Sequence, residues 1–234
     1  MSLDSLRDEV FEANQELVRR GLVVFTFGNA SGFDPESGKI VIKPSGVPYD
    51  VLTPQDLVVT DLEGRILEGT LRPSSDLPTH AALYKAFKGV RGVVHTHSRY
   101  ATAWAQAHAE IPCLGTTHAD YFQGPIPVTG TMTPDEIESN YEWNTGGTII
   151  RRFAELDPLK TTAVLVAGHA PFCWGTSPTA AAHTAVVVEE LAHMAYLTVT
   201  INADIREISR SLRDKHFLRK HGPEAYYGQI RKQG

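Results

Sequence analysis

The sequence is short of cysteine, of excess charge and of long apolar runs. Its 234 residues contain only two cysteines, Cys113 and Cys173. They lie far apart and in no metal-binding spacing, so we expect no disulfide framework and a reducing, cytoplasmic location. The formal net charge of −5 argues against nucleic acid as a partner, but it leaves room for a local cationic pocket that binds a phosphate.

Signals for membranes and export are missing as well. No segment approaches the roughly 18 unbroken apolar residues of a membrane span. The N-terminal stretch MSLDSLRDEVFEANQELVRR is charged and amphipathic and has no signal-peptide apolar run. We therefore expect no membrane partner.

What is present is an ordinary globular composition. Apolar residues make up 42% of the chain and charged residues 21%, which is enough for a sizeable core. No Gly/Ser linker and no internal repeat divides the sequence, so we predict one domain over residues 1–234. Helix and strand patterns alternate, and an early hairpin signal at Glu63-Gly64 argues against a simple parallel sheet. The prediction is an α/β (α+β-like) fold with helices around a mixed sheet.

Periodicity and capping residues give the expected elements. Apolar residues at helical spacing predict helices over 3–20, 79–87, 98–107, 133–143, 147–156, 177–197 and 204–220. Runs rich in β-branched and aromatic residues predict strands over 22–27, 39–43, 92–97 and 162–167, with a hairpin over 56–67.

Histidines at two strand ends form the strongest chemical pattern. His95 and His97 close the apolar run of strand 92–97 and share one face, because alternate residues of a strand point the same way. Two polar histidines, each satisfied by a carbonyl, would also fit a strand end. His169 directly follows the second apolar strand, however, and three imidazoles converge if both strands end at one sheet edge. Neutral imidazoles with an open position are typical of a catalytic zinc site, and Asp76 is a candidate carboxylate ligand.

Three short polar loops are candidates for phosphate binding. They are FGNASG (27–32), KPSG (43–46) and PSSD (73–76). Small residues let backbone N–H groups approach an anion, Ser and Asn add donors, and Lys43 supplies a positive charge. Each loop alone is an ordinary turn, so the prediction depends on their combination with the metal site.

These motifs resemble a known family. The segments GNASG, KPSGV, PSSDLPTH, VVHTHSRYATAWAQA, GTTHADYF, YEWNTG, HAPFCWG and DKHFLRKHGPEAYYGQ are similar to the class II aldolase/epimerase superfamily, and in particular to its pentose-phosphate 4-epimerase branch. The resemblance runs from the first helix to Gln229. Two departures are Ala167, where related epimerases carry a further histidine, and the tail IRKQG beyond Gln229.

The resemblance implies a fold, an assembly and a set of site residues. It implies the class II aldolase fold with a largely antiparallel central sheet, and a homotetramer with active sites between subunits. It implies a divalent metal, zinc or another ion such as manganese, held by His95, His97 and His169, with Asp76 as a weaker member. For phosphate and substrate contacts it implies Gly28, Asn29, Lys43, Ser45, Gly46, Ser74, Ser75 and His216.

The same resemblance implies the reaction and its acid/base groups. The reaction is inversion at C4 of L-ribulose 5-phosphate, which gives D-xylulose 5-phosphate in a pentose pathway such as arabinose catabolism. The C4 hydrogen is not acidic, so cleavage and re-formation of the C3–C4 bond is the feasible route. That route needs acid/base groups on opposite faces of the aldehyde fragment. The resemblance implies Asp120 as one such group and Tyr227, with His216 nearby in sequence, as the other, reaching in from the adjacent subunit.

Two other functions compete with this interpretation. A class II aldolase of the fuculose-phosphate type shares the metal histidines but releases its aldehyde, and it typically has a glutamate as base where Asp76 stands. A non-catalytic sensor of metal and sugar phosphate would lack the acid/base groups. The presence of Asp76, Asp120 and Tyr227 favours the epimerase.

Overall fold

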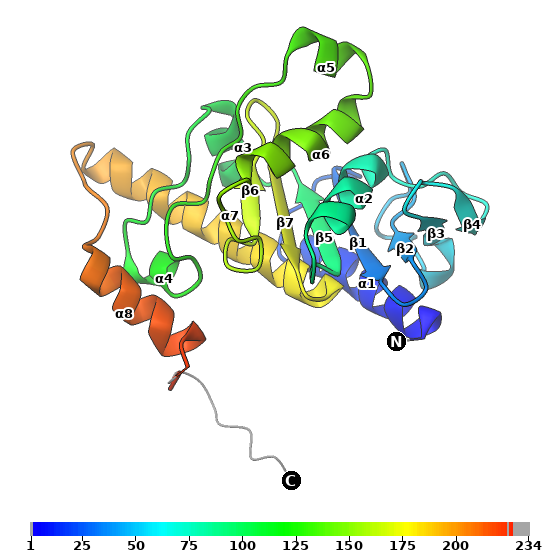
Figure 1. Cartoon of the computed structure of the whole chain (residues 1–234), viewed down its shortest axis with the longest axis horizontal. Coiled ribbons are helices and arrows are strands. Elements are labelled where there is room, and N and C mark those ends of the chain that lie inside the picture. Colours follow the sequence, from blue (N-terminus) through cyan, green and yellow to red (C-terminus); the bar gives the residue numbers. More distant parts are fainter. Residues whose placement is uncertain (1, 224, 227–234) are drawn as a thin grey trace.

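One antiparallel sheet runs through the molecule (Figure 1). In the computed structural model, which describes residues 2–223, 225 and 226, the seven strands have the order β4-β3-β2-β1-β5-β7-β6. The strands are β1 (Gly28–Asp34), β2 (Lys39–Ile42), β3 (Val58–Asp61), β4 (Ile66–Glu68), β5 (Gly92–Thr96), β6 (Ala163–Leu165) and β7 (Pro171–Gly175). All neighbouring strands in this part of the chain pair antiparallel, which confirms the antiparallel-rich sheet.

Helices cover both faces of this sheet (Figure 1). They are α1 (Leu3–Arg19), a short 3-10 helix η1 (Pro54–Asp56), α2 (Leu77–Ala86), α3 (Arg99–Gln106), α4 (Thr116–Ala119), α5 (Pro134–Glu138), α6 (Tyr141–Arg152), α7 (Pro178–Ile201) and α8 (Arg210–His221). Side chains of β5 alternate between two cores, because successive residues of a strand point to opposite faces. Val94 packs in the core formed with α1, α3 and α7, whereas Val93 packs in the core formed with α2 and α6.

The expected strand over 22–27 is wrong. The structure has bends and turns there, and β1 begins only at Gly28. β1 is made of small residues because α1 and α7 lie directly on it: a Cβ on Gly32 would come within 2.8 Å of Val10 and Pro178 side-chain atoms. The segment FGNASG, expected as a loop, is therefore mostly this central strand. The small residues of FGNASG, which are also typical of a turn, allow α1 and α7 to pack closely against this strand.

Several element boundaries also differ from the prediction. The helical segment after Thr133 breaks at residues 139–140 rather than 144–146, and the last helix begins at Arg210 instead of residue 204. Strand β7 was not predicted, although the motif HAPFCWG contains it. Its five residues are all buried, because β7 lies between β5 and β6, where neither face reaches solvent.

Helix α7 is long and apolar enough to cross a membrane by length and composition alone. In this fold it is a core helix that packs against α1, α3, β5 and β7. Its buried face consists mainly of Ala, Val and Leu side chains. The helix therefore lies on the sheet as part of the globular core.

A fully buried histidine predicts an acid-sensitive fold. His80 on α2 has no exposed surface, and its Nδ1 lies 2.7 Å from Ser31 Oγ. Burial lowers the pKa of His80 from 6.5 to about 3. Between these two pH values the unfolded chain binds a proton that the folded chain does not. Stability is therefore full above pH 6.5 and falls as the pH drops, by about 1 kcal/mol per pH unit for this group.

We expect His80→Gln to flatten this pH dependence, although the substitution itself destabilises the fold. Urea unfolding at pH 7.5 and pH 5 measures the difference in the free energy of unfolding for the variant and the natural protein. His193→Gln, at a partly exposed position on α7, serves as the control and should keep the natural difference. If the free energy of unfolding changed equally between the two pH values in the His80→Gln and natural proteins, His80 would not be the source of the acid sensitivity.

Candidate metal centre and phosphate pocket

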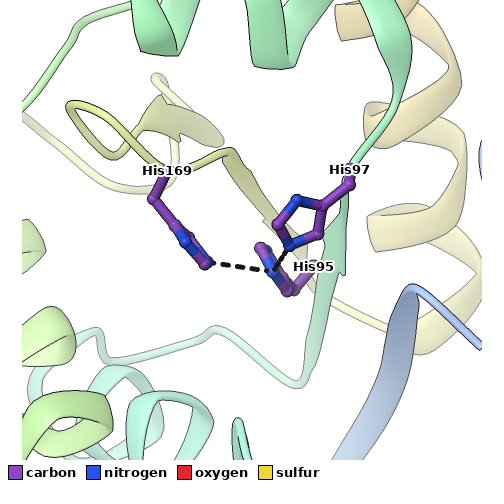
Figure 2. A group of neighbouring side chains, drawn as sticks. All are labelled: His95, His97 and His169. Atoms are coloured by element: carbon purple, nitrogen blue, oxygen red, sulfur yellow. Dashed lines mark hydrogen bonds between the residues drawn. The ribbon is translucent and has the colours of Figure 1, made fainter.

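Three histidines meet at one edge of the sheet (Figure 2). His95 is the fourth residue of β5 and His97 follows the strand's end, while His169 lies in the turn between β6 and β7. Both β5 and β6 are antiparallel to β7 between them, so they run in the same direction and end at the same edge. The sequence expectation that two strand ends bring three imidazoles together is confirmed.

The imidazoles present their Nε2 atoms to one another. His95 Nε2 lies 3.1 Å from His97 Nε2 and 3.2 Å from His169 Nε2, and the three candidate ligand atoms all lie within 4.8 Å of one another. This spacing lets one cation contact all three nitrogens, since zinc–nitrogen bonds are about 2 Å long.

Two hydrogen bonds orient the outer sides of the rings. His95 Nδ1 lies 3.0 Å from the Pro171 carbonyl oxygen. A carbonyl only accepts, so Nδ1 carries the proton and Nε2 keeps its lone pair for a metal. His169 Nδ1 lies 3.5 Å from the hydroxyl of Tyr141. Such partners on the far ring nitrogen fix the tautomer of a ligating histidine.

The protonation of the cluster also suits a metal. Burial lowers the pKa of His97, and the nearby His95 lowers it further. Burial, again with help from His95, lowers the pKa of His169 to about 4. Both imidazoles are therefore neutral at pH 7, the form in which histidine binds metal ions. The donor set fits a divalent cation such as zinc.

The histidine cluster opens into a cavity of about 550 Å³ that also contains the predicted phosphate loops. Every substrate-binding candidate except His216 lines it: Gly28, Asn29, Lys43, Ser45, Gly46, Ser74 and Ser75, together with Asp76 and the three histidines. Backbone hydrogen bonds hold the loops in register, from Ser45 N to Arg72 O and from Ser74 N to Lys43 O. Segments about 30 residues apart in sequence thus form one polar wall.

Lys43 is the cationic residue of this wall. Its side chain is buried, and its Nζ donates to the Val47 carbonyl at 2.7 Å and lies 4.6 Å from the centre of the Tyr49 ring. Burial lowers the pKa of Lys43 to about 8, so the ammonium is still largely protonated at neutral pH. Tyr49 in turn donates to the Gly28 carbonyl at 2.8 Å, which ties the lysine loop to the start of β1.

Asp76 lies beside the histidines but outside their group of ligand atoms. Its Oδ2 accepts a 2.6 Å hydrogen bond from Asn29 Nδ2. Burial raises the pKa of this carboxyl, but His95 and His80, together with the Asn29 bond, lower it by more, so the net pKa is below its ordinary value. Asn29 Oδ1 is buried and has no hydrogen-bond partner among the described residues, so it is free to accept from a bound hydroxyl.

Asp120 and His216 belong to a different surface. His216 Nδ1 lies 3.0 Å from Asp120 Oδ1, and Arg219 donates to both carboxylate oxygens at 3.0 and 2.7 Å. Burial raises the pKa of Asp120, but the Arg219 and His216 hydrogen bonds lower it by more, so the carboxyl is ionised at neutral pH. Neither residue lines the metal cavity. Tyr227, the other predicted acid/base residue, lies outside the described residues.

Some cavity residues were not assigned a role from the sequence. Tyr141 and Glu142 reach the cavity from the start of α6, and Thr26 and Phe27 reach it from the segment before β1. Tyr141 and Glu142 belong to the motif YEWNTG. That motif supported the family resemblance, but no chemical role was predicted for its residues. Phe27 lay in both the predicted strand over 22–27 and the candidate phosphate loop FGNASG, but neither prediction gave its side chain a role.

Comparison with known proteins identifies the family to which this seven-stranded fold and its three histidines belong. The chain belongs to the class II aldolase family: the profile described as Class II Aldolase and Adducin N-terminal domain matches residues 8–196. Among curated relatives, L-ribulose-5-phosphate 4-epimerase UlaF of Salmonella paratyphi A (strain ATCC 9150 / SARB42) is 52% identical over 227 residues, 97% of this chain and 100% of the relative. UlaF of Salmonella typhi is similar to the same extent. These relatives confirm the resemblance carried by the motifs.

Solved structures agree on the fold. An L-fuculose 1-phosphate aldolase has a TM-score of 0.77 at 23% identity, over 92% of this chain and 96% of that one. YgbL of Klebsiella pneumoniae, a putative aldolase/epimerase/decarboxylase, has a TM-score of 0.72 at 27% identity, over 92% and 99% of the two chains. The class II aldolase fold expected from the motifs is therefore confirmed.

Proposed function

We propose that this protein is a metal-dependent L-ribulose-5-phosphate 4-epimerase, acting in the cytoplasm with residues 1–234 as one catalytic domain. One observation carries the proposal: the three-histidine cluster and the polar phosphate wall share a single cavity. A ketopentose phosphate has groups for both parts of this cavity: oxygens at C2 and C3 for the histidine cluster, and a phosphate at C5 for the polar wall. The 52% identity to the UlaF epimerases over nearly the whole chain supports the particular substrate.

The chemistry follows from the position of the reacting carbon. C4 is one carbon too far from the C2 carbonyl for its hydrogen to be acidic. Removal of the C4 hydroxyl proton instead lets the C3–C4 bond break, with its electron pair delocalised into the C2 carbonyl as an enediolate. Glycolaldehyde phosphate then turns over and presents its other face, and the C3–C4 bond re-forms with inverted configuration at C4.

In this scheme His95, His97 and His169 hold the divalent cation, with Asp76 beside them, and we favour zinc because the donor set is three imidazoles. A cation bound there would supply Lewis-acid stabilisation of the negative charge that develops on the substrate oxygens. Ser45, Gly46, Ser74 and Ser75 bind the phosphate with Lys43 behind them, while Gly28 and Asn29 contact the sugar. This phosphate anchor holds the fragment through its rotation.

The proton transfers are assigned to Asp120 and Tyr227 from the adjacent subunit, with His216 beside Asp120. An ionised carboxylate is the correct form for a base, and Asp120 lies away from the histidine cavity of its own chain. We propose a homotetramer in which each cavity is completed by a neighbour. Support comes from the outer side of α7, where Tyr196, Leu197 and Ile201 are 50%, 46% and 86% exposed, since large exposed apolar patches are typical of protein interfaces.

The test is a product analysis. Purified, metal-loaded protein incubated with L-ribulose 5-phosphate should produce D-xylulose 5-phosphate. A chelator should stop the reaction, and added zinc or manganese should restore it. Accumulation of free dihydroxyacetone and glycolaldehyde phosphate without the epimer would instead identify an aldolase.

A further inference from the structure

The segment before β1 exposes several large apolar side chains, one of which lines the cavity that holds the three histidines. Val24, Phe25 and Phe27 are 55%, 82% and 53% exposed. Of these three residues only Phe27 lines the cavity. Phe25 and Phe27 lie in edge contact, with ring centroids 6.0 Å apart, and neighbouring exposed apolar side chains, unlike a single one, commonly mark a binding surface.

The backbone holds Phe27 in a defined place. Its N–H donates to the Val24 carbonyl at 3.0 Å and closes a turn. Phe25 inside this turn has a φ of 54°, a conformation that costs energy for a bulky side chain. Gly28 follows with a φ of 112°, and a Cβ there would lie 2.7 Å from the His95 carbonyl oxygen. Phe27 is therefore fixed between a strained turn and the first residue of β1, which packs closely against β5.

This position sets the ring of Phe27 against a candidate metal ligand. The ring centroids of Phe27 and His97 are 6.4 Å apart with an interplanar angle of 60°, an edge contact. His97 presents its Nε2 to the other two histidines (Figure 2). Phe27 thus forms an apolar wall of the cavity beside one of the three histidines.

We propose that Phe27 is a specificity-determining residue that keeps the aldehyde fragment in the cavity and so directs the reaction to epimerisation rather than cleavage. This inference rests on the proposed function. After the C3–C4 bond breaks, two outcomes compete. Re-addition of the enediolate C3 to the aldehyde carbon forms the bond again, and the new C4 alkoxide takes up a proton. Escape of glycolaldehyde phosphate leaves the enediolate to be protonated at C3, which yields free dihydroxyacetone.

The apolar wall formed by Phe27 favours re-addition over release of the aldehyde in two ways. It narrows the route by which the aldehyde leaves while the phosphate remains bound to Ser45, Ser74 and Ser75. It also limits the access of water, which supplies the proton that ends the enediolate. A small side chain at position 27 removes both effects and leaves the three histidines and the phosphate wall unchanged.

The experiment measures the fraction of turnovers that end in release. Metal-loaded natural protein, Phe27→Ala and Phe27→Trp are incubated with L-ribulose 5-phosphate, and both D-xylulose 5-phosphate and dihydroxyacetone are quantified. We expect Phe27→Ala to raise the released fraction by about tenfold or more, and Phe27→Trp to keep it close to the natural value. Val24→Ala is the matched control, because Val24 lies in the same segment but does not line the cavity.

The outcomes separate the two proposals. An epimerising Phe27→Ala protein whose released fraction stays within about twofold of the natural value overturns the role of Phe27. Loss of bound metal from Phe27→Ala also overturns this role, because Phe27 would then affect the reaction by supporting metal binding instead of retaining the aldehyde. A natural protein that releases fragments and makes no epimer overturns the epimerase itself.

Discussion

Replacing His97 by alanine is expected to abolish metal retention and epimerisation together. The substitution removes one of three Nε2 atoms that lie within 4.8 Å of one another, and two imidazoles hold a divalent cation much more weakly than three. Without the cation the charge that develops on the substrate oxygens loses several kcal/mol of stabilisation, so turnover should fall by about 10³-fold or more. Metal content after dialysis and the rate of D-xylulose 5-phosphate formation measure the two effects.

His193→Ala is the matched control for this prediction. His193 lies on α7, stacked on Tyr100 with ring centroids 3.9 Å apart, and it is not part of the metal cavity. The control should keep metal and activity close to the natural values. Full activity of the His97→Ala protein without metal would overturn the site assignment.

The second large effect concerns Asp120. Asp120→Asn should lower turnover by about 10²- to 10⁴-fold while metal stays bound, because the variant loses a base and keeps the histidine cluster. If the active site lies between subunits, mixing this variant with His97→Ala should restore activity. In randomly assembled oligomers about a quarter of the sites combine intact histidines from one chain with an intact Asp120 from its neighbour. Co-expression of the two variants under different affinity tags provides such oligomers.

This complementation separates a shared site from one formed within a single chain. Each variant alone should be inactive, and the mixture should reach about a quarter of the natural activity. A mixture that stays inactive although both chains co-purify would show that Asp120 does not act on a neighbour's cavity. Size-exclusion chromatography of each variant checks that the loss of the Asp120–Arg219 ion pair has not changed the assembly.

The three-histidine cluster was the part of this protein most open to prediction. His95 and His97 share a face by strand geometry, and His169 follows a second apolar run, so their convergence depends only on two strands ending at one edge. The structure meets that condition through β7, a strand that was not predicted although the motif HAPFCWG contains it. The cavity then gathers nearly all the predicted phosphate contacts as well.

Other features depended on packing that local sequence does not record. The apolar stretch over residues 22–27 has strand composition, yet the strand forms over the small residues that follow, because α1 and α7 approach them too closely for large side chains. Within this apolar stretch Leu22 is buried in the core, while Val24, Phe25 and Phe27 remain exposed. The end of the stretch puts the ring of Phe27 beside His97.

By itself the sequence determined the chemistry that this chain carries: three imidazoles for a divalent cation, small and hydroxyl-bearing loops for a phosphate, and the family to which these motifs belong. Residue type and spacing are enough for that, because ligand preference and strand periodicity are local properties. Only the tertiary structure decided which groups share a cavity and that Asp120 pairs with His216 and Arg219 on a separate surface. It also decided that the ring of Phe27 lies beside His97 of the histidine cluster. Those relations join residues up to about a hundred positions apart, and they arise from how the helices pack on the sheet.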